Sequence, residues 1–171
     1  VEDLHYRRSC YDPCLFCHMT DKGPNGHILL DVDDIATSGN AAHDQAMQKL
    51  QKLLLFGKWK TIYKEEGDYC GRTVIQLPDY SFKIHQAKFV EERLTSIDIM
   101  KGRRSDPKRP TTDGEKSQLR AVWGSINWLQ RETRADVSGR ASLGMSRINC
   151  SQVQDLIDAN KVVEILKATP D

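Results

Sequence analysis

The amino-acid sequence is most informative at residues 26–37, which read Gly26-His27-Ile28-Leu29-Leu30-Asp31-Val32-Asp33-Asp34-Ile35-Ala36-Thr37. Apolar residues lead into this stretch and leave it again, and the adjacent aspartates Asp33 and Asp34 interrupt the run. The pattern predicts two short strands joined by a tight reversal. Two neighbouring carboxylates repel each other, and a divalent cation would relieve the repulsion because hard cations favour carboxylate oxygens.

Asp31 adds a third carboxylate to the stretch. By the strand period of two, Asp31 and Asp33 are expected on one face with Asp34 at the turn, so that two or three carboxylates converge at a hairpin tip. An EF-hand calcium loop is excluded, because Ile35 and Ala36 stand where that loop needs an oxygen ligand and a glycine. The other interpretation is a solvated turn, in which Asp is common. On these residues alone both interpretations stay open.

The composition is that of an ordinary globular protein. The 171 residues suit one domain, or one and a partial second, and are 39% hydrophobic and 29% charged. A net charge of +1 gives no overall attraction to nucleic acid or membranes, so such a partner must be argued from local clusters. No apolar run is long enough to span a bilayer. The chain starts at Val1 without a signal-peptide pattern, so we expect an intracellular protein that is a piece of a longer polypeptide.

The hydrophobic periodicity predicts an α+β protein with two halves. The first half, residues 1–100, is expected to be an antiparallel sheet with hairpins and helices, followed by a basic linker over 101–112 and an all-helical region over 113–171. The expected elements of the first half are strands within 13–40, an amphipathic helix over 41–56 carrying Met47, Leu50 and Leu54, a β region from 59, a hairpin over 70–84 around Pro78-Asp79, and a helix over 86–99.

The helical region has a clear apolar stripe that predicts its core. We expect Trp123 to be part of this core and Trp128 to lie in the core or an interface, rather than as base-stacking platforms. A weaker helix is expected over 134–147, loosened by Gly139 and Gly144, and Ser151 is the expected N-cap of the last helix. The predicted core positions are Leu119, Val122, Trp123, Ile126 and Leu129, then Val153, Leu156, Ala159, Val163 and Leu166.

Three of the five cysteines, Cys10, Cys14 and Cys17, precede His18 in a cluster. The segment Cys14-Leu15-Phe16-Cys17-His18 fits the c-type haem attachment pattern, and the cysteine and histidine types suit zinc. An unrelated metal-binding protein is therefore one hypothesis. The other interpretation is a strand interior in which cysteine is a small hydrophobe, and we adopt it because haem attachment needs export and zinc needs a second ligand pair. Cys70 and Cys150 stand alone, so we expect reduced thiols.

Five basic residues are clustered between the two halves of the chain. Such a run is either solvated surface or a sequence-independent contact to the phosphate backbone of a nucleic acid. The residues are Lys101, Arg103, Arg104, Lys108 and Arg109.

Several segments, taken in chain order, resemble the reverse transcriptase of copia-type LTR retrotransposons. The resemblance covers nearly the whole chain, and it depends on the order and spacing of the segments more than on any single one. The segments are Asp12-Pro13-Cys14-Leu15-Phe16, Asp31-Val32-Asp33-Asp34 at the aromatic-x-Asp-Asp motif, Phe56-Gly57-Lys58-Trp59, Tyr69-Cys70-Gly71, Phe82-Lys83-Ile84-His85-Gln86, Arg120-Ala121-Val122-Trp123-Gly124-Ser125 and Thr133-Arg134-Ala135-Asp136.

This resemblance implies a right-hand polymerase with a palm-type sheet and a helical thumb. It implies that Asp33 and Asp34 are catalytic and hold two Mg²⁺ ions for nucleotidyl transfer, with Asp31 and Val32 next to the nucleotide. Ile84 and Gln86 would belong to the primer grip, and the basic cluster would bind nucleic acid. The implied partners are an RNA or DNA template-primer, dNTPs, an upstream polymerase half and a downstream RNase H region of the same polyprotein, within a cytoplasmic virus-like particle.

The chain departs from the family pattern at two positions. Asp31 replaces the aromatic residue before the aspartates, and Ala135 replaces a proline. The family's other catalytic aspartate and its fingers lie upstream of this chain, so we expect no polymerase activity from this polypeptide alone. The alternative is a non-catalytic remnant or nucleic-acid-binding module that retains the fold.

Overall fold

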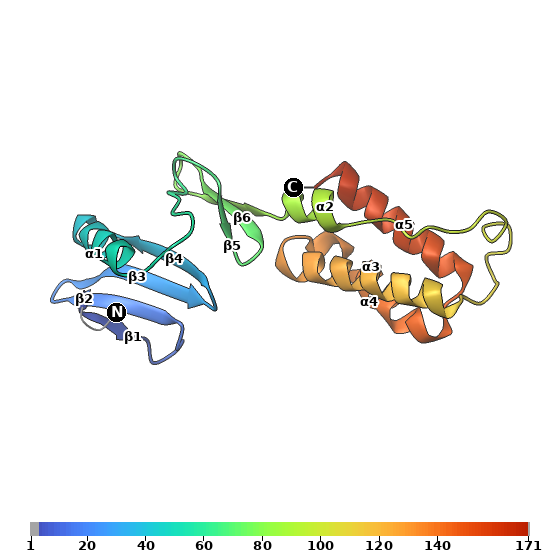
Figure 1. Ribbon diagram of the computed structural model, residues 1–171, viewed down its shortest axis with the longest axis horizontal. Coiled ribbons are helices and arrows are strands. Elements are labelled where there is room, and N and C mark those ends of the chain that lie inside the picture. The colour runs from blue at the N-terminus through green and yellow to red at the C-terminus, as the bar shows by residue number, and fades with distance from the viewer. Residues whose placement is uncertain (1–3, 171) are drawn as a thin grey trace. The chain divides into compact units, whose positions relative to one another are not determined.

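The computed structural model describes residues 4–170, and the chain divides into two compact units after Phe82. The first unit holds an antiparallel sheet and a helix, and the second is helical, so the predicted α+β class is confirmed (Figure 1). The division lies earlier than the expected boundary at residue 100. The reason is that Val90, Leu94 and Ile97 are buried in the core of the helical unit.

The first unit is built on a four-stranded antiparallel meander with the order β1-β2-β3-β4. The sequence predicted the antiparallel strands within residues 13–40, but it did not predict the edge strand β1. Three residues are too few to show an alternation of apolar and polar side chains. The strands are β1 (Tyr6–Arg8), β2 (Leu15–Thr20), β3 (Gly23–Asp31) and β4 (Asp34–Gly39).

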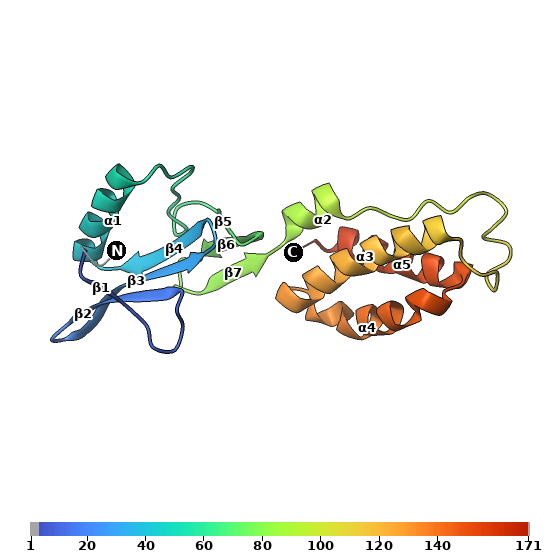
Figure 2. The ribbon, with the colours of Figure 1, turned by 60° about the horizontal axis from the view of Figure 1, so that its bottom comes forward.

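Helix α1 (Ala41–Leu53) covers one face of this sheet (Figure 2). Asn40 caps it, because the side-chain oxygen accepts hydrogen bonds from the two amides that follow Ala41. Met47 and Leu50 are buried against the sheet, in a cluster with Tyr6 and Ile28. Leu54 was expected to continue this face, but the helix has ended there and the residue is 51% exposed.

A second, three-stranded sheet has the order β5 (Gly67–Tyr69), β6 (Arg72–Gln76) and β7 (Phe82–His85). The predicted hairpin around Pro78-Asp79 is present, and the amide of Leu77 donates to the carbonyl of Ser81 across it. The strand expected from residue 59 is not formed, since residues 59–66 adopt turns and irregular backbone.

Helix α2 (Ala87–Arg93) is shorter than the predicted helix over 86–99. From Leu94 the backbone is extended, and Asn160 of helix α5 (Val153–Ala168) fixes this conformation. Its Oδ1 accepts from the Ile97 amide at 2.8 Å, and its Nδ2 donates to the Ile97 carbonyl at 2.9 Å. These two bonds replace the intrahelical partners that residue 97 would have had, so the predicted helix ends early.

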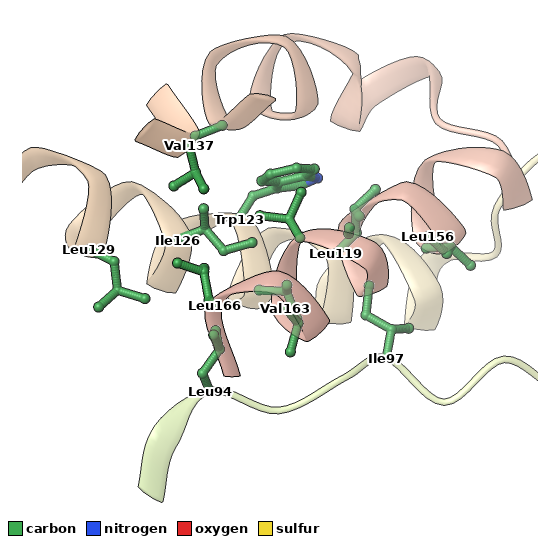
Figure 3. Packing of buried hydrophobic residues seen from close by; sticks show 14 of the residues in the cluster. Leu94, Ile97, Leu119, Trp123, Ile126, Leu129, Val137, Leu156, Val163 and Leu166 are labelled. Carbon is green, nitrogen blue, oxygen red and sulfur yellow. The ribbon is translucent and has the colours of Figure 1, made fainter. Parts of the chain in front are cut away.

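The second unit consists of α2 and three longer helices that pack around one core (Figure 3). All ten predicted core positions of this region are buried, which confirms the stripe on α3 and the apolar positions of α5. The longer helices are α3 (Asp113–Glu132), α4 (Ser138–Arg147) and α5 (Val153–Ala168), with 3-10 turns η2 (Ala135–Val137) and η3 (Ile148–Cys150) between them.

The N-termini of α3 and α5 are both closed by capping boxes. Thr112 and Glu115 exchange hydrogen bonds at the start of α3. At α5 the cap is Gln152, paired with Asp155, and the prediction of Ser151 is wrong by one residue. The Ser151 hydroxyl lies 2.7 Å from that of Thr111 and donates to the Ile148 carbonyl.

Within residues 4–170, none of the helices combines the length and the apolar character that crossing a membrane requires.

Candidate functional site

The candidate carboxylates lie at the tip of the β3–β4 hairpin. Asp31 pairs with Asp34 across the two strands, and Val32 and Asp33 form the two-residue turn between them. The expectation that Asp31 and Asp33 share a strand face is therefore wrong, because the alternation of side chains ends where the strand ends. Asp33 is exposed at the turn, and Asp34 is half-buried at the start of β4.

The turn carries backbone strain at Val32. This residue has a φ of +54° and a fully exposed side chain. A β-branched residue in the left-handed region is a genuine outlier, which costs about 1–3 kcal/mol unless the surroundings impose it. The hairpin tip is therefore a place where the fold holds a turn that its sequence does not favour.

Cys70 connects this tip to the turn between β5 and β6. Its amide donates to Oδ2 of Asp34 at 2.9 Å, and its thiol donates to Oδ2 of Asp31 at 2.9 Å. Cys70 and Gly71 both have positive φ, +49° and +72°, as a type I′ turn requires. One residue therefore holds both carboxylates of the cross-strand pair.

Burial and these contacts change the acid–base chemistry of the turn. Burial first, and then the hydrogen bond to Asp31, raises the pKa of the Cys70 thiol to about 11. Burial, followed by a hydrogen bond with Cys70, raises the pKa of Tyr69 to about 12. Both groups are therefore neutral near pH 7, and the thiol acts as a hydrogen-bond donor rather than as a thiolate nucleophile.

The carboxylate oxygens at this tip are hard ligands of the kind that Mg²⁺ prefers. Asp33 is exposed, and Asp34 uses only one of its two oxygens for Cys70. Among residues 4–170, no three His, Cys, Asp or Glu side chains are grouped so that they could hold a metal ion. The two aspartates match Mg²⁺ in ligand type alone.

Arg103 of the basic cluster is buried rather than free to bind a phosphate. Its Nε lies 2.6 Å from Oε1 of Glu115, and its Nη2 donates to Oε2 of Glu115 and to the Pro110 carbonyl. The expectation that residues 101–112 form an unpacked linker is therefore wrong. The segment is anchored to α3 by an ion pair and to α5 by main-chain bonds from Val153 and Gln154.

The other four basic residues of the cluster, Lys101, Arg104, Lys108 and Arg109, are exposed. They lie on a segment with a defined backbone, because the carbonyl of Arg109 accepts from the Val153 amide. The structure therefore separates the cluster into one buried arginine and four cations that face solvent.

The two candidate primer-grip residues differ in their surroundings. Ile84 is 50% exposed on β7. Gln86 is 2% exposed, and its Oε1 accepts a hydrogen bond from Thr133 at 2.9 Å. Its Nε2 is buried without a partner. Gln86 therefore joins α2 to the end of α3 and does not face solvent.

The cysteine cluster is not gathered around a common point. Cys17 and His18 lie on β2, as the strand interpretation predicted, while Cys10 and Cys14 are exposed outside it. All five cysteines are free thiols. His18 instead forms a hydrogen bond with Asn25.

A buried histidine that sequence reasoning missed, His43, lies in the first turn of α1. The Tyr6 hydroxyl is 2.5 Å from Nδ1 of His43, and Nε2 of His43 is buried without a partner. Gly26 and Gly39 pack against the imidazole so closely that an added Cβ would lie 2.4 Å from it. Two glycines on paired strands opposite a helix are the signal that could have indicated a large buried side chain.

Comparisons with known proteins add no information about the site. No protein-family model, curated protein or solved structure matches this chain. The arrangement at the hairpin tip and the four exposed cations are therefore the observations on which a function can be argued.

Proposed function

We propose that this chain is the C-terminal palm and thumb portion of a copia-type reverse transcriptase, with Asp33 and Asp34 as carboxylates for two-metal nucleotidyl transfer. One observation supports this most. The Asp31–Asp34 turn contacts the Tyr69-Cys70-Gly71 turn, although Asp34 and Cys70 are 36 residues apart. The resemblance involves both turns independently, and their contact is what a shared active site requires.

The proposed reaction extends a primer by one nucleotide. The primer 3′-oxygen forms a bond to the α-phosphorus of a dNTP, the bond from that phosphorus to the pyrophosphate oxygen breaks, and the 3′-hydroxyl proton passes to solvent. Bound Mg²⁺ ions supply activation of the hydroxyl and neutralisation of the leaving charge. Asp33 and the free oxygen of Asp34 would hold these ions, with the remaining ligands supplied from outside this chain.

The helical unit supplies the surface for nucleic acid in this proposal. Lys101, Arg104, Lys108 and Arg109 are exposed and provide contacts to phosphates without sequence preference. Arg103 is assigned no such contact, because its guanidinium is occupied by Glu115. Ile84 is exposed on β7 and is the remaining candidate for the primer grip.

A non-catalytic nucleic-acid-binding module is the second candidate. The observation that favours it is that Cys70 donates hydrogen bonds to both Asp31 and Asp34. Of the three carboxylates, Asp33 is then the one without a hydrogen bond to Cys70. In this alternative the exposed cations bind a duplex, and the hairpin tip serves only to join the β3–β4 turn to the β5–β6 turn.

Primer extension distinguishes the two candidates. The chain is joined to an upstream segment that carries the fingers and a further aspartate, and dNTP incorporation on an RNA template is measured with Mg²⁺. We expect Asp33→Asn to lower the rate by about a hundredfold or more, since a metal ligand contributes several kcal/mol to the transition state. The matched control is Asp21→Asn, an exposed aspartate in the β2–β3 turn, which should leave the rate unchanged. Incorporation that survives Asp33→Asn overturns the catalytic assignment.

Duplex binding by the 171-residue chain tests the surface that both candidates share. Fluorescence anisotropy with a labelled RNA–DNA duplex is measured over a range of salt concentrations. Arg104→Glu should weaken binding and reduce the slope of log affinity against log salt. A charge reversal at the exposed Glu164 of α5 is the control and should have no such effect. An unchanged slope for Arg104→Glu would mean that these basic residues are solvated surface and do not contact the duplex.

A further inference from the structure

We propose that residues 49–64, at the end of α1 and in the loop that follows it, form a surface that docks on anionic lipid bilayers. This 49–64 surface combines exposed apolar side chains with exposed lysines. Its residues take no part in the proposed reaction or in duplex binding, so docking on lipid is independent of the proposed function.

The apolar side chains of the 49–64 surface face solvent. Leu55 is fully exposed, Leu53 at the end of α1 is 74% exposed, and Tyr63 is 64% exposed. Soluble proteins expose single apolar residues commonly, but a group of large ones marks a site of interaction with a partner or a membrane. The members of the group are Leu53, Leu54, Leu55, Trp59 and Tyr63.

Inward contacts hold the loop that carries these side chains. Phe56 packs against the core between the first sheet and α1, and its ring meets that of Trp59 edge-on, with the centroids 5.3 Å apart. Farther along, the carbonyl of Ile62 accepts a hydrogen bond from the amide of Gln76 on β6. The loop runs from the end of α1 to β5 (Figure 2), and it is anchored at both of these points while its leucines stay outside the core.

The charge of the 49–64 surface has a single sign. Between Asp44 and Glu65 the sequence has five lysines and no Asp or Glu. All five lysines are exposed, and the one hydrogen bond from Lys60 goes to a neutral group, the Glu66 carbonyl. Long lysine side chains lay their methylene groups along apolar surface and keep the ammonium group in water. The lysines are Lys49, Lys52, Lys58, Lys60 and Lys64.

An anionic bilayer fits both the leucines and the lysines. Apolar side chains insert among the acyl chains, Trp and Tyr favour the interface, and lysines are attracted to anionic headgroups. A second copy of the chain would bring two sets of lysines together, which like charges oppose. A nucleic acid would contact the lysines and stack on the aromatic rings, but it would leave the leucines in water. The combination therefore favours a lipid surface.

Vesicle flotation with the 171-residue chain tests the role of the charge. Vesicles of phosphatidylcholine are compared with vesicles that also contain phosphatidylserine, and we expect binding to the second kind alone, weakening as salt is raised. Lys52→Glu should lower the partition coefficient about fivefold or more, since each basic residue near such a surface contributes about that factor. Lys167→Glu is the matched control, because both lysines are exposed in the last turn of a helix.

Insertion of the apolar residues is tested on the same vesicles. Leu55→Gln should lower the partition coefficient about fivefold, because the amide no longer gains from leaving water. Leu143→Gln, at an exposed position on α4, should have no effect. Lipids brominated in their acyl chains should quench tryptophan fluorescence, and Trp59→Phe should remove the quenching. Quenching that persists in Trp59→Phe would assign the contact to another tryptophan and overturn the proposal.

The remaining outcomes separate lipid from other partners. Urea unfolding with unchanged midpoints shows that Lys52→Glu and Leu55→Gln are folded. Equal binding to both kinds of vesicle, or binding to neither, would overturn the proposal. If the two substitutions weaken binding of the labelled RNA–DNA duplex and leave vesicle binding unchanged, the 49–64 surface binds nucleic acid and the lipid proposal is overturned.

Discussion

Arg103 and Glu115 form a nearly buried, bidentate ion pair, with Nε 2.6 Å from Oε1 and Nη2 2.8 Å from Oε2. Glu115 also accepts from the amide and hydroxyl of Thr112, so the pair joins the 101–112 segment to the capping box of α3. Burial raises the pKa of Glu115, but the hydrogen bonds from Thr112 and Arg103 outweigh this effect and hold the pKa below its ordinary value. The carboxylate is therefore charged at neutral pH and depends on its donors for stability.

Removing the guanidinium should destabilise the helical unit. Arg103→Met leaves Glu115 charged, buried and without its main partner, which costs about 3 kcal/mol. Urea unfolding followed by far-ultraviolet circular dichroism measures the loss. Arg104→Met is the matched control, because Arg104 is exposed on the same segment and should change stability little. Equal effects of the two substitutions would contradict the buried pair.

The two glycines of α4 should respond oppositely to alanine. A Cβ at Gly144 would lie 2.2 Å from Cε2 and Cζ2 of Trp123, whereas a Cβ at Gly139 meets nothing within 4 Å. Gly144→Ala should therefore destabilise the unit by about 2 kcal/mol through overpacking. Gly139→Ala should be neutral or stabilising by about 0.5 kcal/mol, since alanine has the higher helix propensity. Thermal unfolding of both variants checks the contrast, and a stabilising Gly144→Ala would be inconsistent with the packing of Trp123.

Asn160 should be essential to the segment that follows α2. Its side chain makes two hydrogen bonds to the main chain of Ile97, and both residues are buried. Asn160→Ala leaves a buried amide and a buried carbonyl without partners, which costs about 3 kcal/mol. The comparison is Asn149→Ala, an exposed asparagine in η3, measured by urea unfolding. Faster hydrogen exchange at the Ile97 amide should accompany the loss, and protection that persists in Asn160→Ala would refute the role.

The sheet unit should lose stability in mild acid because of His43. Burial lowers the pKa of this imidazole below its ordinary value of 6.5, and His18 and His27 add to the lowering, while Asp44 opposes it. The unfolded chain therefore takes up a proton that the folded chain resists. The contribution of His43 is fully present above about pH 6.5, and it is lost as the pH falls from that value through the lowered pKa of the folded state.

Hydrogen exchange of the β3 amides between pH 7 and 5 measures this loss in the sheet unit alone. His43→Gln should be less stable at neutral pH and show a weaker dependence of its unfolding free energy on pH. His5→Gln, at an exposed position, should retain the dependence of the unsubstituted chain. If His43→Gln and the unsubstituted chain respond equally to pH, His43 is not the responsible group.

Local patterns in the sequence were sufficient to predict the α+β class, the antiparallel strands of the first sheet and the helical core. The stripe on α3 repeats at the helical period, so Leu119, Trp123 and Ile126 could be assigned to one buried face without knowing what covers them. The β3–β4 hairpin was equally clear, because two short apolar runs separated by a charged break are typical of two strands joined by a turn. These features depend on neighbours within a few residues of one another.

Contacts between distant residues decided the rest. Asn160 bonds the main chain of Ile97 from 63 positions away in sequence, and Glu115 converts Arg103 from a surface cation into a buried one. A periodic pattern cannot report such partners, because the pattern is the same whether a side chain meets water or an acceptor.

The carboxylates at the β3–β4 tip were determined partly by the local sequence and partly by tertiary contacts. The sequence located Asp31, Asp33 and Asp34 at a reversal of the chain, but it placed Asp33 rather than Asp34 on the face of Asp31. The sequence predicts an isolated reduced thiol at Cys70, since nothing near it in sequence marks it as a partner for a carboxylate. It lies at the tip because two hairpin turns meet there, and only tertiary packing can bring them together.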